Sequence, residues 1–148
     1  MRATYRVLAQ LIVAGVVVQA MVVAFGVFQA FSDVDDGQAL TKSTLEDNAP
    51  AGLILHSIIG STVIPLLAII LFIIAFFAKV DQGVKWAGFV LLAVIVQVVL
   101  GIASHGEPAL GLLHGLNAFA VAGLAAVAAR RAMGTGVAPS APAGAPAV

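Results

Sequence analysis

Residues 51–78 read AGLILHSIIGSTVIPLLAIILFIIAFFA, a stretch without Asp, Glu, Lys or Arg. A helix that rises about 1.5 Å per residue needs about 20 such residues to cross roughly 30 Å of hydrocarbon. Lipid offers no partner to free backbone N–H and C=O groups, so a chain that crosses it in one segment must be helical. The stretch therefore predicts a membrane-spanning helix, and His56 lies within it.

Three further stretches share this character, at residues 7–31, 84–103 and 109–129, with Lys85 as the single charged residue in them. The chain of 148 residues is 61% hydrophobic and 9% charged, whereas soluble domains are about 45–50% apolar and about 25% charged. We therefore expect an all-α integral membrane protein whose residues 1–133 form an up-down-up-down four-helix bundle. The first stretch exceeds the h-region of a signal peptide, about 7–15 residues, and should remain in the mature protein.

Positive charge is divided unevenly between the two sides of such a bundle. Lys42 alone falls on one side, and the other side holds Arg2, Arg6, Lys79, Lys85, Arg130 and Arg131. The positive-inside rule then predicts a multi-pass protein of the cell membrane with both termini in the cytoplasm. Six acidic residues fall on the outer side, namely Asp33, Asp35, Asp36, Glu46, Asp47 and Glu107. The last segment, 134–148, is rich in Ala, Pro and Gly, and we expect a disordered cytoplasmic tail.

Composition also excludes several classes of function. The formal charge is zero and no basic run could neutralise a row of phosphates, so the expected partner is the lipid bilayer and not nucleic acid. The chain has no cysteine. Disulfides, thiolate metal sites, Fe–S clusters and covalently attached c-type haem are therefore excluded together.

Two histidines lie at matching depth in the predicted bundle. His56 and His114 each come about five residues after the outer end of a span, the second and the fourth, which is roughly 7–9 Å below the rim. These two spans are diagonal in a four-helix bundle, with axes roughly 11–14 Å apart. That gap suits two imidazoles that bind one iron with a porphyrin edge-on between them, and neutral imidazole is tolerated in lipid. The sequence thus predicts b-type haem with His56 and His114 as ligands of the haem iron.

Small residues accompany the two histidines. Gly60 stands one turn below His56, where a Cβ could strike a macrocycle, and Gly101 faces the same way as Gln97 on the third span. Such residues leave room for a flat apolar group, although close helix packing explains them as well. His105 would extend this stripe to the outer rim if the third helix continued so far. It is then a candidate haem-propionate donor or third ligand, with an ordinary loop residue as the alternative.

The two halves of the chain show a faint internal repeat. Val16–Gln19 resembles Val94–Gln97, and Leu55–His56 resembles Leu113–His114. Either the halves are duplicated hairpins related by an axis along the membrane normal, or Val-rich helices resemble one another by chance. Pro65 should kink the second helix below His56. Intramembrane amides are expected to bridge helices, with quinone binding as the alternative, at Gln10, Gln19, Gln29 and Asn117.

Three segments together resemble one four-helix half of the haem A synthase family: LHSIIG at 55–60, VQVVLG at 96–101 and LHGLNA at 113–118. The resemblance extends over about residues 53–129. It implies haem bound near the outer surface by one histidine on the second helix and one on the fourth, here His56 and His114. The family's catalytic half has a glutamate and an arginine at the positions of Leu53 and Ser57, and many members have loop cysteines that this chain lacks. These departures argue against haem O oxidation.

We therefore predict a membrane haem protein for electron transfer or haem handling. A chain of half the family's length implies one haem per chain or a homodimer, and a respiratory-chain protein is a candidate partner. One alternative is a haem-free membrane subunit or assembly factor with structural histidines. The second alternative is a haem-oxidising enzyme that acts as a dimer.

Overall fold

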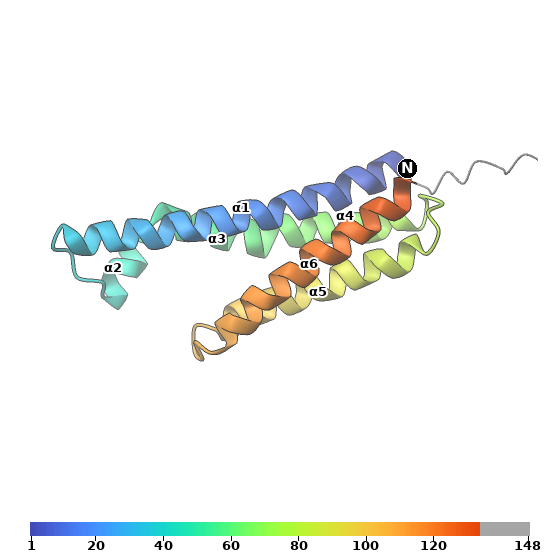
Figure 1. Cartoon of the computed structure of the whole chain (residues 1–148). Coiled ribbons are helices and arrows are strands. Elements are labelled where there is room, and N and C mark those ends of the chain that lie inside the picture. The colour runs from blue at the N-terminus through green and yellow to red at the C-terminus, as the bar shows by residue number, and fades with distance from the viewer. Residues whose placement is uncertain (134–148) are drawn as a thin grey trace, which may run out of the picture.

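Within residues 1–133 the fold consists of four long helical segments and one short helix (Figure 1). The computed structural model describes residues 1–133, and the predicted tail lies outside them. The elements are α1 (Arg2–Asp35), α2 (Lys42–Asp47), α3 (Ala51–Ile58), the π-helix η1 (Ile59–Val63), α4 (Ile64–Ala75), α5 (Gly83–Ala103) and α6 (Leu110–Met133). Together α3, η1 and α4 form the second long segment. All four segments are long and apolar enough to cross a membrane, as predicted.

Two helices extend beyond the predicted spans because hydrogen bonding does not stop where apolar side chains end. The helix α1 continues to Asp35, and the chain leaves it through Gly37, whose φ of +86° suits glycine. The helix α6 continues through two arginines to Met133. By contrast, α4 ends at Ala75, before the predicted end of the span at residue 78. The following turn places Lys79 in a left-handed conformation with φ of 51°.

At the predicted kink below His56 the helix contains a π-helical turn, η1, which ends at Val63, two residues before Pro65. Proline lacks an N–H, so the carbonyl of Ser61 loses its usual helical partner. Wider π turns commonly occur where the regular ladder is interrupted. The Ser61 hydroxyl donates to the carbonyl of Ser57 at 2.7 Å, a bond of the kind that often bends helices. The second span therefore changes its winding within one turn of His56.

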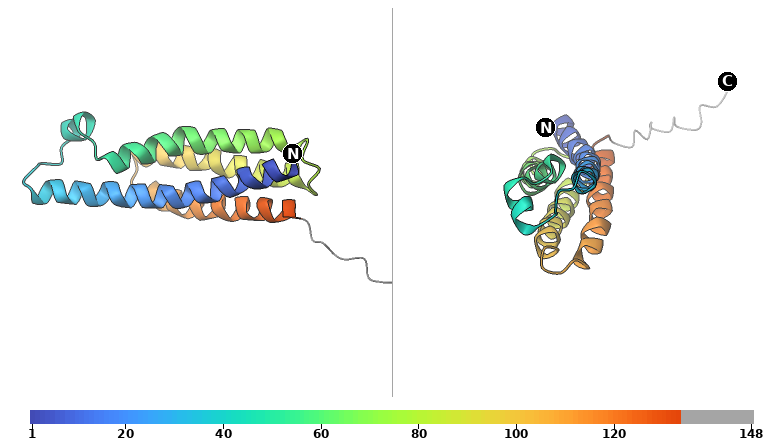
Figure 2. Two further views of the ribbon diagram at one scale, coloured as in Figure 1. Left: turned by 90° about the horizontal axis from the view of Figure 1, so that it is seen from above. Right: turned by 90° about the vertical axis from the view of Figure 1, so that its left-hand side faces the viewer.

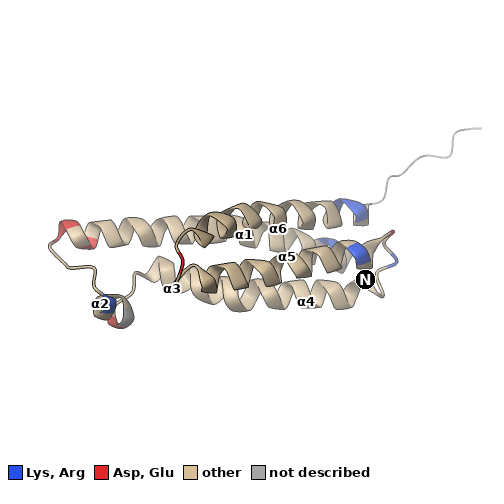
Figure 3. Cartoon of the chain, turned by 90° about the horizontal axis from the view of Figure 1, so that it is seen from below, with Lys and Arg blue, Asp and Glu red and all other residues tan. Residues whose placement is uncertain are grey.

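The long segments pack as a ring of neighbours (Figure 2). The helix α1 packs against α6 and against the second segment, and α5 packs against α4 and α6. The second and fourth segments are thus diagonal to each other. Most basic residues lie at the end of the molecule that holds the N-terminus, and most acidic residues lie towards the other end (Figure 3).

The apolar core occupies the half of the bundle that contains the N-terminus. Its fully buried members include Tyr5, Ile12, Leu71, Val90 and Val121, and many of the remaining members are alanines. Large apolar side chains cover the outside instead: Phe28 is 70% exposed, and Leu112 and Phe119 are each 78% exposed. So much exposed apolar surface is stable in lipid and not in water.

Candidate functional site

A layer of polar side chains follows the apolar core, and every long helical segment contributes to it. Its members are Gln19 from α1, His56 from α3, Gln97 from α5, and His114 and Asn117 from α6. Gln19 is buried and the other four are half-buried. Polar side chains at this depth in an apolar bundle are costly, and they commonly mark functional sites. We call these five residues the polar layer.

The two predicted histidines face each other in this layer. The ring centroids of His56 and His114 are 6.1 Å apart, and the ring planes meet at 65°. With metal–nitrogen bonds of about 2.0–2.1 Å, two imidazoles on opposite sides of one metal ion have ring centroids roughly 6–6.5 Å apart. The spacing of the pair therefore fits two axial ligands of a single metal centre.

Each histidine ring is oriented by the backbone of a glutamine on the preceding long helix. The Nδ1 of His56 lies 3.3 Å from the carbonyl oxygen of Gln19, and the Nδ1 of His114 lies 3.0 Å from that of Gln97. A carbonyl oxygen only accepts, so each Nδ1 carries the hydrogen and the Nε2 of a neutral ring keeps its lone pair. Metal-binding histidines are commonly oriented in this way. The faint sequence repeat thus corresponds to a repeated contact.

The side chains of the two glutamines behave differently. The Gln19 amide donates to the backbone carbonyl of His56 at 3.0 Å, next to the π turn. The Gln97 amide nitrogen lies 3.1 Å from the Nε2 of His114, and the Gln97 oxygen accepts from Asn117 at 2.8 Å. Asn117 also donates to the carbonyl of Ala93 at 2.9 Å. In both halves of the chain a glutamine carbonyl contacts Nδ1 of the histidine. Only in the second half does the glutamine side chain also contact Nε2.

The two predicted glycines make room for the polar layer itself. A Cβ on Gly60 would lie 2.6 Å from the Gln19 amide nitrogen, and a Cβ on Gly101 would lie 3.1 Å from Cε1 of His114. We predicted that these positions clear space for a macrocycle. The structure gives a nearer reason, because one glycine admits the Gln19 amide and the other admits the imidazole of His114.

His105 lies two residues beyond the end of α5, which ends at Ala103. The helix that its predicted role required therefore stops short of it. The ring is exposed, and its Nδ1 lies 3.1 Å from the carbonyl oxygen of Gly101 and 3.2 Å from that of Ile102. These carbonyls belong to the last turn of α5, where unpaired acceptors are normal. His105 thus caps its own helix, as an ordinary loop residue can.

The side chain of Gln29 and a pair of glycines hold α3 in place. The Gln29 side chain accepts from the backbone N–H of Gly52 at 3.0 Å, so it bridges α1 and α3 as expected, whereas Gln10 is exposed. Gly26 and Gly52 bring the two backbones together, and a Cβ on Gly26 would lie 2.5 Å from the backbone nitrogen of Leu53. The contact fixes the start of the helix that carries His56, and the sequence analysis did not identify it.

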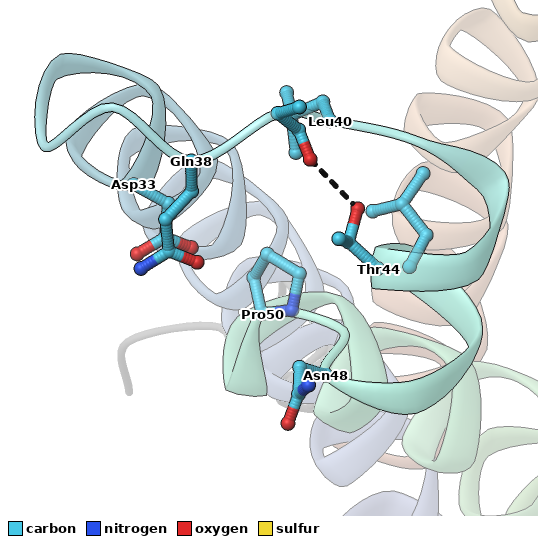
Figure 4. A pocket seen from close by; sticks show the side chains of 8 residues that line it. Asp33, Gln38, Leu40, Thr44, Asn48 and Pro50 are labelled. Carbon is cyan, nitrogen blue, oxygen red and sulfur yellow. Dashed lines mark hydrogen bonds between the residues drawn. The ribbon is translucent and has the colours of Figure 1, made fainter.

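Two hollows in the described residues have space for a small group. The first, of about 40 Å³, lies in the connection between α1 and α3 (Figure 4) and has room for little more than water. The second is an open apolar groove of about 440 Å³ along α5 and α6, with Asn117 among its lining residues. Neither is lined by a histidine. The ring pair therefore remains the candidate centre.

No protein-family model, curated protein or solved structure matches this chain.

Proposed function

We propose that this chain is a multi-pass protein of the cell membrane that binds one b-type haem, with His56 and His114 as the axial ligands. In this proposal the helices form an up-down-up-down bundle with both termini in the cytoplasm. The observation that carries the proposal is the ring pair, whose centroids are 6.1 Å apart. Both rings present Nδ1 to a backbone carbonyl, which leaves Nε2 as the metal-binding nitrogen.

The donor set favours haem over a bare metal ion. Within residues 1–133 no group of three or more His, Cys, Asp or Glu side chains could hold a metal ion. Structural zinc sites use four protein ligands and catalytic ones use three. Two histidines alone match the axial positions of an iron whose remaining ligands come from a porphyrin.

The packing of the helices is compatible with a flat group at this level. In the described residues, α3 packs on α1, and α5 packs on α6, but α3 forms no comparable interface with α5 or α6. The apolar core that closes the other half of the bundle does not continue here. Exposed apolar residues are the immediate sequence neighbours of the two histidines, Leu55 on α3 and Leu113 on α6. In a bilayer these side chains would contact lipid or an apolar group beside the pair.

A bound haem would supply one-electron transfer or be held for delivery. The chain's own contribution is to orient the rings: Gln19 and Gln97 hold each Nδ1–H, and Gly101 leaves space for the His114 ring. The basic end of the bundle is the cytoplasmic one by the positive-inside rule, so the pair lies nearer the outer face. A redox or haem-handling partner would then approach from outside or within the bilayer.

A haem-free role is the second candidate, and one contact favours it. The Nε2 of His114 already lies 3.1 Å from the Gln97 amide, so this ring can be satisfied without a metal. The chain would then be a membrane subunit or assembly factor with structural histidines. Haem oxidation by a dimer has less support, because Leu53 and Ser57 flank His56 where the haem A synthase family has an acid and a base.

Absorption spectroscopy distinguishes these functions. The protein is purified in detergent from haem-replete cells, beside a variant with both His56→Ala and His114→Ala. We expect a Soret band and, after reduction, the narrow α-band of six-coordinate low-spin haem b in the wild type only. A colourless wild-type protein would contradict the proposal and leave the structural role of the histidines.

A further inference from the structure

The hydrogen bonds from Asn117 to His114 have a single consistent direction. The Asn117 amide nitrogen faces the carbonyl of Ala93, which only accepts, so this nitrogen is correctly placed as the donor. The same nitrogen faces the Gln97 side chain at 2.8 Å, which must therefore present its oxygen. The opposite atom of that amide, an N–H donor, is then turned to the Nε2 of His114 at 3.1 Å.

The other ring nitrogen leads to the same state of His114. Its Nδ1 donates to the backbone carbonyl of Gln97 at 3.0 Å, so the hydrogen of a neutral ring lies there. Nε2 is left as an acceptor, and it receives the Gln97 amide hydrogen. In a protonated ring Nε2 would also carry a hydrogen, and this N–H would point at the N–H of the Gln97 amide. The hydrogen bonds from Asn117 through Gln97 to His114 thus begin and end at a backbone carbonyl, that of Ala93 and that of Gln97. Because a carbonyl only accepts, these two groups fix the direction of every bond between them.

His56 has no such contact at its second nitrogen. The side chain of its own glutamine, Gln19, donates to the backbone carbonyl of His56 and not to the ring. Within residues 1–133 the His56 Nε2 has no hydrogen-bond partner. The two imidazoles are therefore unequal, since one offers a free lone pair and the other an occupied one.

We propose that the Gln97 side chain is a latch on His114, which makes His114 the releasable ligand and His56 the permanent one. The inference rests on the proposed haem ligation and assigns positioning roles to Gln97 and Asn117. A haem iron would compete with the Gln97 amide for the lone pair on Nε2 of His114, so the amide would have to turn away for His114 to serve as a ligand. With His114 unbound, the amide would stabilise the free ring through the hydrogen bond to Nε2.

Carbon monoxide binding to the reduced haem protein measures this stabilisation. Carbon monoxide takes the position that a released imidazole leaves, and in the wild type the Gln97 amide holds the ring. Gln97→Leu removes that hydrogen bond, so we expect carbon monoxide affinity to fall about 2- to 10-fold. Asn117→Leu leaves the Gln97 amide in place but free to rotate, and it also removes the donor to the Ala93 carbonyl, so it should lower the affinity less. Gln10→Leu makes the same chemical change at an exposed position of α1 and should have no effect.

A haem-free measurement separates the two proposals. In apoprotein labelled with ¹⁵N-histidine, the His114 Nε2 resonance should move towards that of an unbonded lone pair in Gln97→Leu and stay unchanged in Gln10→Leu. Haem binding with unchanged resonance and carbon monoxide affinity would overturn the latch and leave the proposed function intact. A shifted resonance in a protein that never binds haem would overturn the proposed function, and with it the role of His114 as a ligand.

Discussion

The imidazole rings of His56 and His114 lie 6.1 Å apart, although their helices, α3 and α6, form no other extensive interface among the described residues. Ordinary apolar packing does not bring these rings together, because the buried core lies in the other half of the bundle. Each ring is held instead by a backbone carbonyl of a neighbouring helix, on α1 for His56 and on α5 for His114. The pair thus has the same kind of support in both halves of the chain.

The first prediction concerns the identity of the ligands. His56→Ala and His114→Ala should each convert low-spin haem into a high-spin form or abolish binding, because one imidazole leaves the iron five-coordinate. His105→Ala should keep the low-spin spectrum, since this exposed ring contacts only the end of α5 in the described structure. Absorption and electron paramagnetic resonance spectra of the three variants make the comparison. Loss of the low-spin form in His105→Ala, with His114→Ala unaffected, would show that the ligand pair is wrong.

The second prediction tests the close contact between α1 and α3. Gly52→Ala places a Cβ against the backbone of Gly26 and Val22, which cannot move without separating the helices. Overpacking of this kind costs about 1–3 kcal/mol. We expect a lower midpoint of thermal unfolding in detergent and a lower haem content, because α3 carries His56. Gly123→Ala, where a Cβ meets nothing within 4 Å, is the matched control and should not lower the midpoint. Equal midpoints for the two variants would contradict the contact.

The third prediction concerns the end of the bundle that holds the N-terminus. The buried Tyr5 hydroxyl donates to the backbone carbonyl of Gly83 at 2.9 Å and so ties α1 to the start of α5. Tyr5→Phe keeps the ring but leaves that carbonyl without this donor, which costs about 1–3 kcal/mol. Thermal unfolding should show the loss, whereas the haem spectrum should be unchanged because the polar layer is remote. A spectral change would mean that the two ends of the bundle are coupled.

The fourth prediction is the orientation in the membrane. The basic residues at the end that holds the N-terminus predict a cytoplasmic reporter when it is fused after Val148. A reporter inserted at Gly37, in the connection between α1 and α2, should be external. Fluorescent and alkaline-phosphatase reporters give opposite signals on the two sides and check both positions. Reversed signals would place the histidine pair near the cytoplasmic face.

Much of the fold could be predicted from the sequence because the length of an apolar stretch and the backbone's need for hydrogen bonds leave only a helix. The matching depth of the two histidines was predicted by counting residues from the outer end of each span. Side-chain partners could not be predicted in this way. Whether Gln97 meets the ring of His114 or only its backbone depends on how far each helix is rotated and shifted along its axis. The sequence resemblance between residues 16–19 and 94–97 marked both glutamines, but it could not show that their amides differ.

The last prediction tests the space around the His114 ring. A Cβ on Gly101 would lie 3.1 Å from Cε1 and 3.2 Å from Nδ1 of His114, so the ring must move by a few tenths of an ångström. That movement strains the bond from Nδ1 to the Gln97 carbonyl. At about 1 kcal/mol for mild overpacking, Gly101→Ala should shift the equilibrium from six- to five-coordinate iron roughly fivefold. Gly88→Ala, on the same helix, places its Cβ in ordinary contact with Phe72 at 3.6 Å and should leave the spectrum unchanged. The high-spin fraction by electron paramagnetic resonance measures the difference, and equal fractions in both variants would show that Gly101 does not position the ring.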